Sequence, residues 1–309
     1  MVIYRLTVSR PVGLETRCLT PNLFYSNFTH SLFGNRSTLS TAKTNPVVLV
    51  TGGSAGLGRV IATTFASAGY RVAIVGRNQE RLESARSAIG TTEQTLCCAA
   101  DLTIEADAVR TIRQVGDHFG RLDVLVNCVG TSDRGAIENL TSERMIDLVE
   151  QNVCTTLHCS KAALPLLEES SGVIINIGSL AAKVGTRYLG GYCIAKHALA
   201  GMTQQMRLEW LSRGVHVGLI NPGPIRRDDE GSRYQSKLDG NIPVEASRPG
   251  GGTKVKGLAA DEVAAIVLDC VRRRRPDVIL PRYLRLLITL GNLSPRLGDW
   301  LLLKFSSSK

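Results

Sequence analysis

The stretch "PVVLVTGGSAGLGR", residues 46–59, decides the fold of this chain. The valine-rich run at 46–50 predicts a buried strand, and the segment at 57–69 has the apolar spacing of a helix. Gly52, Gly56 and Gly58 lie where the strand turns into the helix. Glycines at such a junction allow a tight turn and let backbone N–H groups approach a pyrophosphate. The stretch therefore predicts a phosphate-binding turn at the end of the first strand.

The alternation of short apolar runs and helical segments continues along the chain. Continuous apolar strands separated by helices indicate a parallel sheet that is covered on both faces. We therefore expect an α/β, Rossmann-type doubly wound fold in a single domain over 46–270, with ligands at the carboxyl ends of the strands. Further strands are predicted at 71–75, 122–127, 172–178 and 215–221, and further helices at 78–88, 104–119, 141–168 and 191–213.

The basic residues of the chain are concentrated at its ends. The formal charge is +10, of which residues 1–46 carry +4 and residues 271–309 carry +7, so the part between them is near −1. A nearly neutral domain without a zinc-finger or RNA-recognition pattern does not predict a nucleic-acid-binding surface. We therefore expect no nucleic-acid partner.

Residues 1–45 form an N-terminal extension rich in Ser, Thr and Arg and poor in acidic residues. This composition is typical of an organelle-targeting segment, of a disordered tail, and of upstream codons misassigned to a protein. The extension has no apolar run behind a basic start, so a secretory signal is not predicted.

The eight cysteines form no CxxC pair, and most lie inside apolar runs. Free cysteines behave in this way as small buried hydrophobic residues in a reducing compartment. We therefore expect a cytoplasmic location and no metal site.

The second predicted strand ends in "IVGRN", residues 74–78. A carboxylate at such a position binds the ribose hydroxyls of NAD, whereas an arginine accommodates the 2′-phosphate of NADP. Gly76 takes the place of the acid and Arg77 follows it. The sequence therefore predicts NADP(H), the alternative being a solvated arginine at the start of a helix.

The stretch "SLAAKVGTRYLGGYCIAK", residues 179–196, contains a candidate pair of catalytic residues. Tyr192 and Lys196 are four residues apart and share one face of a helix. An ammonium close to a phenol favours the phenolate, which lowers the pKa of the tyrosine by about a unit or more. The pair therefore predicts a general acid/base. Ser179 follows a predicted strand, where its hydroxyl could hydrogen-bond a substrate oxygen.

Together these features make the chain resemble a short-chain dehydrogenase/reductase of the simple, single-domain type. The resemblance covers residues 46 to 270, with seven motifs in the order typical of the family. They are "TGGSAGLG" at 51–58, "DL" at 101–102, "NCVG" at 127–130, Asn152, Ser179, the Tyr192–Lys196 pair and "NPGPI" at 221–225.

The resemblance implies a catalytic role for four residues. Tyr192 would donate or accept the proton, Ser179 would steady the substrate oxygen, and Lys196 would also bind the nicotinamide ribose. Asn152 would hold a water that links Lys196 to solvent. The family also implies a homodimer or homotetramer built on the helices that carry Asn152 and Tyr192.

The resemblance likewise implies a set of cofactor-binding positions. Asp101 would contact the adenine, and Asn127 would steady the central strands near the cofactor. Besides Arg77, Asp101, Asn127, Tyr192 and Lys196, the implied positions are Gly52, Ser54, Gly56, Leu57, Gly58, Leu102, Gly130, Pro222, Gly223 and Ile225.

Two features depart from the family pattern. Cys128 and Val129 stand where the family often has other residues, and these apolar changes are expected only to repack the site. Arg227 stands where the family usually has a threonine near the nicotinamide carboxamide. The resemblance therefore does not say how this chain would bind the nicotinamide. Arg227 belongs to a polar loop, 226–257, which we expect to cover the substrate.

Residues 271–309 form a basic, leucine-rich tail that we expect to be helical. No part of it has the ~18 uninterrupted apolar residues that a membrane span needs. The tail fits a helix pair that lies on an anionic membrane or holds a lipid-like substrate, and it equally fits ordinary packing against the domain or a partner.

We thus expect an NADP(H)-dependent oxidoreductase that interconverts a ketone or aldehyde and an alcohol. The tail favours a lipid-like substrate, such as a long-chain ketone of the ketosphinganine or oxoacyl kind. The alternative is a non-enzymatic NADP-binding sensor or scaffold with the same fold. Binding of NADPH without turnover of any carbonyl would favour that alternative.

Overall fold

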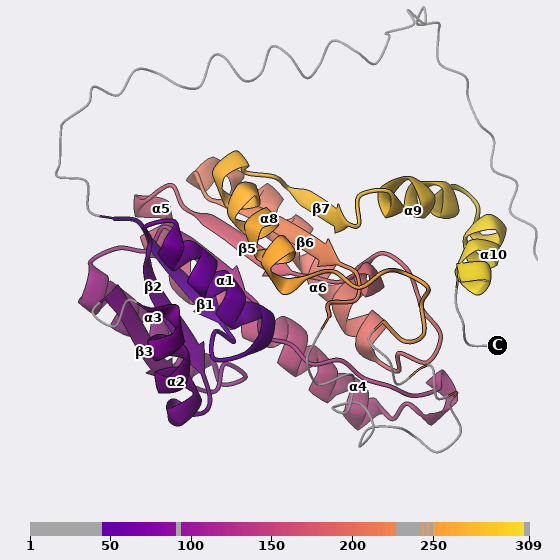
Figure 1. Ribbon diagram of the computed structural model, residues 1–309, viewed down its shortest axis with the longest axis horizontal. Coiled ribbons are helices and arrows are strands. Elements are labelled where there is room, and N and C mark those ends of the chain that lie inside the picture. Colours follow the sequence, from indigo (N-terminus) through magenta and orange to yellow (C-terminus); the bar gives the residue numbers. More distant parts are fainter. Residues whose placement is uncertain (1–44, 91–93, 227–242, 244–245, 247–249, 306–309) are drawn as a thin grey trace, which may run out of the picture. The chain divides into compact units, whose positions relative to one another are not determined.

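The computed structural model describes residues 45–90, 94–226, 243, 246 and 250–305. Within them, the strands form one parallel sheet in the order β3-β2-β1-β4-β5-β6-β7 (Figure 1). The seven strands are β1 (Val47–Thr51), β2 (Arg71–Gly76), β3 (Thr95–Ala99), β4 (Val124–Asn127), β5 (Val173–Ile177), β6 (His216–Pro222) and β7 (Asp277–Leu280).

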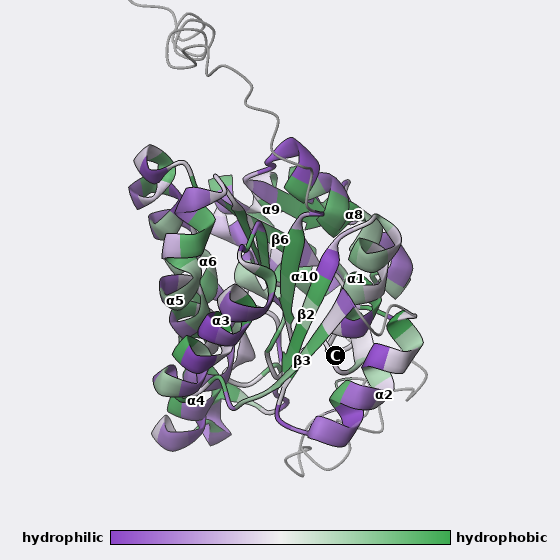
Figure 2. Ribbon diagram, turned by 90° about the vertical axis from the view of Figure 1, so that its left-hand side faces the viewer, coloured by the Kyte–Doolittle hydropathy of each residue, from purple (hydrophilic) through white to green (hydrophobic). Residues whose placement is uncertain are grey.

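Helices cover both faces of this sheet, as Figure 2 shows. On one face lie α1 (Gly56–Ser67), α2 (Gln79–Ile89) and α8 (Ala260–Arg273). On the other face lie α3 (Glu105–Phe119), α5 (Thr155–Glu169) and α6 (Tyr192–Glu209). The predicted doubly wound α/β fold is confirmed.

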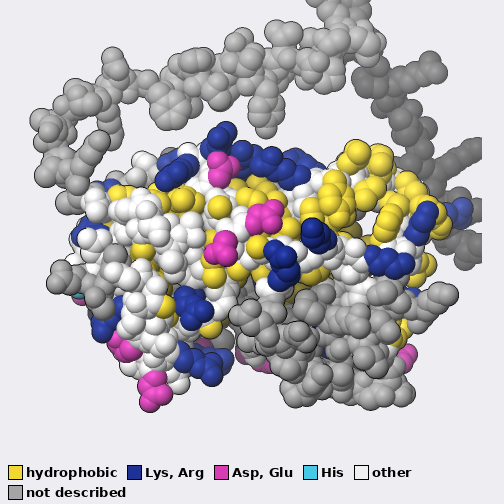
Figure 3. Space-filling view, in the orientation of Figure 1, with side chains coloured by type: hydrophobic (Ala, Val, Ile, Leu, Met, Phe, Trp, Pro, Cys, Tyr) yellow, Lys and Arg dark blue, Asp and Glu magenta, His cyan; other side chains and the backbone are white. Residues whose placement is uncertain are grey.

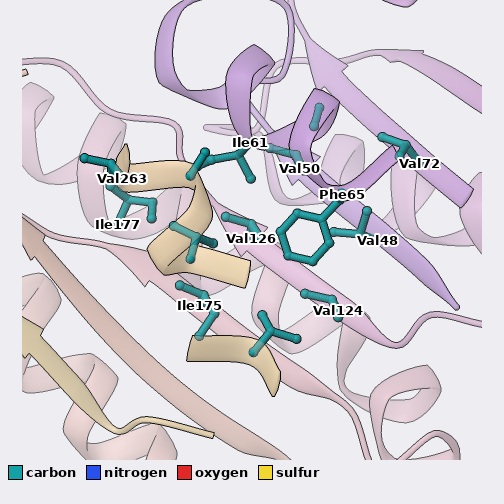
Figure 4. Close-up of a cluster of buried hydrophobic side chains, with 14 of the residues drawn as sticks. Val48, Val50, Ile61, Phe65, Val72, Val124, Val126, Ile175, Ile177 and Val263 are labelled. Carbon is teal, nitrogen blue, oxygen red and sulfur yellow. The ribbon is translucent and has the colours of Figure 1, made fainter. Parts of the chain in front are cut away.

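The core on the α1 face is built from β-branched and aromatic side chains. Phe65 of α1 and Val263 of α8 are fully buried against valines of the central strands (Figure 4). Valine suits this position because its branched side chain packs well on a pleated surface. The continuous apolar runs of the sequence thus become strands buried on both faces.

The remaining elements are short or peripheral. The predicted helix at 141–168 is divided into α4 (Ser142–Val149), a π-helical turn η3 (Glu150–Cys154) and α5. Short helices η2 (Ile137–Asn139), η4 (Leu180–Ala182) and η5 (Leu211–Arg213) lie between larger elements. The chain continues after β7 into α9 (Leu284–Leu293) and α10 (Pro295–Phe305).

Two strands were not predicted, and both lie at the edges of the sheet. β3 contains Cys97 and Cys98 and is only partly buried, and the four residues of β7 are mostly half-buried. An edge strand is covered less completely, so its apolar pattern is weaker. The boundary predicted at residue 270 falls inside α8, and β7 lies in the range predicted as a helical tail. The sheet therefore extends to Leu280, and the tail helices begin after it.

The predicted extension at 1–45 lies, apart from Asn45, outside the described residues. The same holds for most of the predicted loop at 226–257, including Arg227. Residues 250–257 of that loop are described and contribute to the site below.

Candidate active site

The glycine-rich turn between β1 and α1 has a backbone that requires glycine at two kinds of position. Gly52 and Gly56 have backbone φ angles of +68° and +52°, which residues other than glycine rarely adopt. A Cβ on Gly58 would lie 2.3 Å from the carbonyl oxygen of Gly52. The turn can therefore pass close to α1 only because residue 58 has no side chain.

The N-terminus of α1 is suited to an anion. Its N-cap, Ala55, makes no side-chain hydrogen bond, and the first turn contains no acidic residue. The first N–H groups of a helix have no partner within the helix, and the helix dipole favours negative charge there. These residues, with Ser54 and Leu57 beside them, fit a diphosphate.

The end of β2 lies against this turn. A Cβ on Gly76 would lie 3.1 Å from Oγ of Ser54, so the strand end and the turn are in close contact. Arg77 follows directly and is exposed. The predicted cationic residue therefore directly follows Gly76, the strand residue that contacts the glycine-rich turn.

The end of β3 leads to Asp101 and Leu102. Asp101 accepts hydrogen bonds on Oδ1 from the backbone N–H and the hydroxyl of Thr103, at 3.0 and 2.7 Å. Leu102 is buried, and its carbonyl oxygen lies 3.1 Å from Nδ1 of His158 on α5. The local turn thus holds the Asp101 carboxylate in place beyond the strand.

The segment after β4 is tied to β1 by Thr51, which sequence analysis did not single out. The Thr51 hydroxyl oxygen accepts the N–H groups of Cys128 and Val129, at 2.9 and 3.2 Å. A threonine at a strand end gave no separate signal, because its partners lie 77 and 78 residues away in the chain.

Asn127, the last residue of β4 and a residue expected to steady the central strands, belongs to a buried polar network whose other members sequence analysis did not identify. Its Nδ2 donates to Asn176 Oδ1 of β5 at 2.9 Å and to Ser160 Oγ of α5 at 3.1 Å. Asn176 Nδ2 donates in turn to Thr203 Oγ1 of α6 at 2.9 Å. The network fixes two strands and two helices relative to one another. For the partners of Asn127, the one sign in the sequence is the asparagine inside the apolar run "GVIINIG".

Three of the predicted catalytic residues come from the end of β5 and the first turn of α6. Ser179 caps η4, and its Oγ accepts the N–H of Ala181 at 3.2 Å. Tyr192 is the first residue of α6, and Lys196 lies one turn later, with Nζ 5.7 Å from the centroid of the Tyr192 ring. Tyr192 and Lys196 therefore lie on one helix face, as their spacing predicts.

The Lys196 side chain is buried. Its Nζ donates to the carbonyl oxygen of Ile177 at 3.1 Å. Burial lowers the pKa of Lys196 from 10.5 to about 8, and the neighbouring thiol of Cys128 acts weakly in the opposite direction. The lysine is therefore a group whose proton is easily lost near physiological pH.

Asn152 lies in the π-helical turn η3 and is fully buried. Its Nδ2 donates to the carbonyl oxygens of Thr131 and Leu148, at 3.0 and 2.9 Å. Its Oδ1 has no hydrogen-bond partner among the described residues. A Cβ on Gly130 would lie 2.6 Å from this oxygen and 3.3 Å from Lys196 Nζ, so both atoms occupy the space that glycine leaves.

One cavity of about 230 Å³ joins these residues. Its wall includes all four predicted catalytic residues, Asn152, Ser179, Tyr192 and Lys196. Besides Tyr192 and Lys196, five of the predicted cofactor positions line it: Leu57, Gly130, Pro222, Gly223 and Ile225. The other predicted positions lie outside its wall, at or just beyond the carboxyl ends of β1 to β4: Gly52, Ser54, Gly56, Gly58, Arg77, Asp101, Leu102 and Asn127.

The cavity wall also includes residues that were not predicted as site residues, among them Arg134 and Thr253. The buried Arg134 donates through Nε to the carbonyl oxygen of Ala246 at 2.8 Å. Thr253 comes from the segment after the undescribed part of the loop. Arg134 belongs to no sequence motif, whereas Thr253 lies in the polar loop at 226–257 that was expected to cover the substrate. In the described part of the chain, no group of three His, Cys, Asp or Glu side chains is placed to hold a metal ion.

The burial of Lys196 predicts that this residue destabilises the fold. Because the pKa is about 8 when folded and 10.5 when exposed, the charged form costs about 3 kcal/mol at pH 7. We expect Lys196→Met to raise the melting temperature at pH 7 by roughly 4 °C, since part of this gain is offset by the lost hydrogen bond to Ile177. Between pH 8 and 10.5 the unfolded wild-type chain binds more protons than the folded chain, so the stability of the folded wild type rises with pH in that window. The difference in melting temperature between the variant and the wild type should therefore shrink.

Thermal denaturation of the wild type and of Lys196→Met, at pH 7 and near pH 10, measures the difference in melting temperature at each pH. The exposed Lys161→Met is the control, because its ammonium makes only a surface ion pair with Glu105. A Lys196→Met protein that melts well below the wild type at pH 7 would contradict the prediction.

Comparisons with known proteins agree with this geometry. The model of the short chain dehydrogenase family matches residues 46–237. The chain is 30% identical over 269 residues to dehydrogenase/reductase SDR family member 7B of Rattus norvegicus, covering 82% of this chain and 79% of that relative. It is 29% identical over 199 residues to a 3-oxoacyl-acyl-carrier-protein reductase of Homo sapiens, covering 64% and 83%.

A solved structure shows the same fold. It is an actinorhodin polyketide ketoreductase with NADPH, which superposes with a TM-score of 0.69 at 24% identity. The superposition covers 77% of this chain and 96% of that one.

Proposed function

Because the chain belongs to the short-chain dehydrogenase/reductase family, we propose that it is an NADP(H)-dependent oxidoreductase that interconverts a ketone or aldehyde and an alcohol. The observation that carries this proposal is that one cavity is lined by Ser179, Tyr192 and Lys196 together. Carbonyl reduction needs three groups. They are a hydroxyl that can bind the substrate oxygen, a phenol that can give this oxygen a proton, and a buried ammonium.

The residues of the chain handle the oxygen and its proton. The Ser179 hydroxyl donates a hydrogen bond to the carbonyl oxygen of the substrate and so orients the substrate. The Tyr192 hydroxyl gives its proton to that oxygen as the carbonyl is reduced to an alkoxide. The Lys196 ammonium stabilises the phenolate left on Tyr192. The Oδ1 of Asn152, which has no partner among the described residues, accepts a hydrogen bond from a water that returns a proton through Lys196. When bound, NADP(H) supplies or accepts the hydride at its nicotinamide.

The structure supports a dinucleotide site along the strand ends. The uncapped start of α1 would hold the diphosphate, and Asp101 would contact the adenine. Lys196 would bind the nicotinamide ribose, and Asn127 would keep β4 and β5 in register beside it. Gly130, Pro222, Gly223 and Ile225 would let the nicotinamide enter the cavity.

The exposed Arg77 beside the glycine turn supports a preference for NADPH over NADH. A charge-assisted contact with the 2′-phosphate contributes about 1.5–3 kcal/mol, which is more than tenfold in affinity. We therefore expect Arg77→Glu to weaken NADPH binding by more than tenfold and to change NADH binding little. Fluorescence titration with both nucleotides measures this.

The control for Arg77→Glu is Arg113→Glu, which makes the same charge change at an exposed position of α3. A preference for NADH in the wild type, or an equal loss for both nucleotides in Arg77→Glu, would contradict an Arg77 contact with the 2′-phosphate.

Consumption of NADPH by the purified chain tests the proposed activity. The panel should contain short ketones, steroids, quinones and long-chain 3-keto lipids. Turnover of any of them supports the reductase and names its substrate class. Binding of NADPH with no turnover across the panel would favour the non-enzymatic sensor or scaffold instead.

A homodimer or homotetramer is part of the same proposal. The outer face of α6 supports it, because Ile194, Ala198, Gly201 and Leu208 are exposed on that helix at helical spacing. Small and apolar residues allow two helices to approach closely. Light scattering on the purified chain measures the mass against that of the 33.3 kDa monomer.

A cytoplasmic location is supported by the cysteines. The seven in the described residues are all free, and Cys98, Cys159 and Cys270 are buried. Burial raises the pKa of these three thiols, which keeps them protonated and unreactive at neutral pH. Such cysteines are typical of a reducing compartment.

A further inference from the structure

The α9 helix exposes a continuous apolar stripe. Tyr283, just before the helix, and Leu286, Leu290 and Leu293 within it are 59%, 65%, 40% and 78% exposed. Their spacing of three, four and three residues places them on one face. Figure 3 shows hydrophobic side chains gathered where Figure 1 places α9 and α10.

The α10 helix continues this apolar surface. Leu297, Trp300 and Leu303 recur every three residues and are 39%, 53% and 57% exposed. The two helices meet at Gly291 and Gly298, where a Cβ on Gly298 would lie 2.9 Å from the Gly291 carbonyl oxygen. Close packing therefore makes α9 and α10 one unit, and we call its apolar stripes the α9–α10 surface.

Exposed cationic side chains lie on or directly before the same two helices. Arg282, Arg285, Arg296 and Lys304 are exposed, and Asp299 is the single acidic residue between 281 and 305. The Lys304 ammonium lies 4.6 Å from the centroid of the Trp300 ring, at the border between the apolar and the charged groups. Lysine and arginine chains in this arrangement can reach lipid phosphates while leucines enter the acyl region.

Neither helix can cross a bilayer, because no helix in the described residues is long and apolar enough to do so. A helix of 10 or 11 residues is about 15 Å long, half the ~30 Å of a hydrocarbon core. An apolar face on short helices therefore fits the plane of the membrane interface.

We propose that the α9–α10 surface binds the interface of a membrane that contains anionic phospholipids. Charge decides between this occupant and a second copy of the chain. Two copies would bring like charges together around their leucines, whereas an anionic headgroup layer neutralises them.

The surface is connected to the wall of the candidate active site. The carbonyl oxygen of Phe305, the last residue of α10, accepts the N–H of Lys254 at 2.9 Å. The preceding residue, Thr253, lines the cavity. Membrane binding through α9 and α10 therefore brings the cavity wall to the lipid, and the substrate is a carbonyl compound dissolved in the bilayer. This second step rests on the proposed oxidoreductase function.

Vesicle flotation with the full chain tests the surface without any turnover. We expect binding to vesicles of phosphatidylcholine with phosphatidylserine, weak binding to phosphatidylcholine alone, and weaker binding at about 0.5 M than at about 0.1 M salt. Leu286→Gln with Leu293→Gln should weaken binding to the mixed vesicles by at least about tenfold. The matched control is Ile137→Gln with Leu211→Gln, which are 71% and 70% exposed elsewhere.

Four outcomes overturn the surface proposal. The wild type does not bind vesicles, or it binds them equally with and without anionic lipid. The control variant loses as much vesicle binding as the Leu286/Leu293 variant, or the Leu286/Leu293 variant changes its mass in solution while its vesicle binding stays unchanged. The last would assign the surface to a second copy. Melting temperatures of both variants close to that of the wild type show that the fold is intact.

Kinetics test the substrate class separately. We expect the Leu286/Leu293 variant to reduce a long-chain ketone in anionic vesicles about tenfold more slowly and a short soluble ketone at the wild-type rate. Equal rates on the vesicle-borne ketone overturn the bilayer substrate while the membrane surface stands. If neither ketone is reduced although vesicles are bound, the oxidoreductase function has failed instead.

Discussion

Replacing Tyr192 with phenylalanine should lower kcat by about 10²–10⁴-fold, the contribution of a positioned general acid. The substitution removes one hydroxyl at the start of α6 and leaves the ring that packs beside Lys196. NADPH affinity and melting temperature should therefore stay close to those of the wild type. The measurement is NADPH consumption on the first carbonyl substrate that the panel identifies.

Tyr188→Phe is the matched control for this experiment. Tyr188 lies four residues earlier and its hydroxyl accepts a hydrogen bond from Arg187 Nη2 at 3.0 Å, outside the cavity wall. We expect it to keep the wild-type rate. Retained activity in Tyr192→Phe would show that another group protonates the substrate, and an equal loss in the control would point to a general defect of this segment.

Replacing Gly58 with alanine should abolish most cofactor binding. The new Cβ would lie 2.3 Å from the Gly52 carbonyl oxygen, closer than any real contact, so the turn must move away from α1. The N–H groups that would hold the diphosphate then lose their arrangement. We expect the Kd for NADPH to rise at least about 100-fold, or about 3 kcal/mol, and stability to fall by about 1–3 kcal/mol.

Gly116→Ala provides the comparison, because its Cβ would make only an ordinary contact of 3.4 Å with Leu166. Alanine inside α3 should stabilise the helix by about 0.5–1 kcal/mol and leave NADPH binding unchanged. Nucleotide titration and thermal denaturation on both variants measure these effects. Normal NADPH binding by Gly58→Ala would contradict a diphosphate site at this turn.

The sequence predicts the centre of the fold better than its edges. β1, β4 and β5 are fully buried, so they appear as continuous apolar runs. β3 and β7 are covered less completely and were missed. The physical reason is that an apolar pattern records burial, and an edge strand receives only part of it.

The candidate site divides in the same way. Ser179, Tyr192 and Lys196 were predicted because their types and spacing define a chemical unit, and they line one cavity. Thr51 and Arg134 act through partners that are 77 and 112 residues away in the chain. No local pattern records such contacts, since they exist only once the sheet has formed.

The π-helical turn at Asn152 shows a different limit. The residues at 141–168 have helical spacing throughout, and one extra residue in a turn leaves that spacing almost unchanged. The structure shows that this turn buries Asn152 against Thr131 and Leu148. Only backbone geometry distinguishes it from a regular helix.

Among the described residues, β1 is the first strand to be synthesised, yet it lies inside the sheet with a strand on each side. One edge of β1 pairs with β2. The other edge can pair only after β4 has been synthesised, because Val48 pairs with Val124, 76 residues later in the chain. At about 5–20 residues per second, the ribosome leaves that edge open for roughly 4 to 15 seconds. An apolar strand with an open edge can pair with another chain. The nascent protein therefore passes through a period of exposure to aggregation, when a chaperone would protect it.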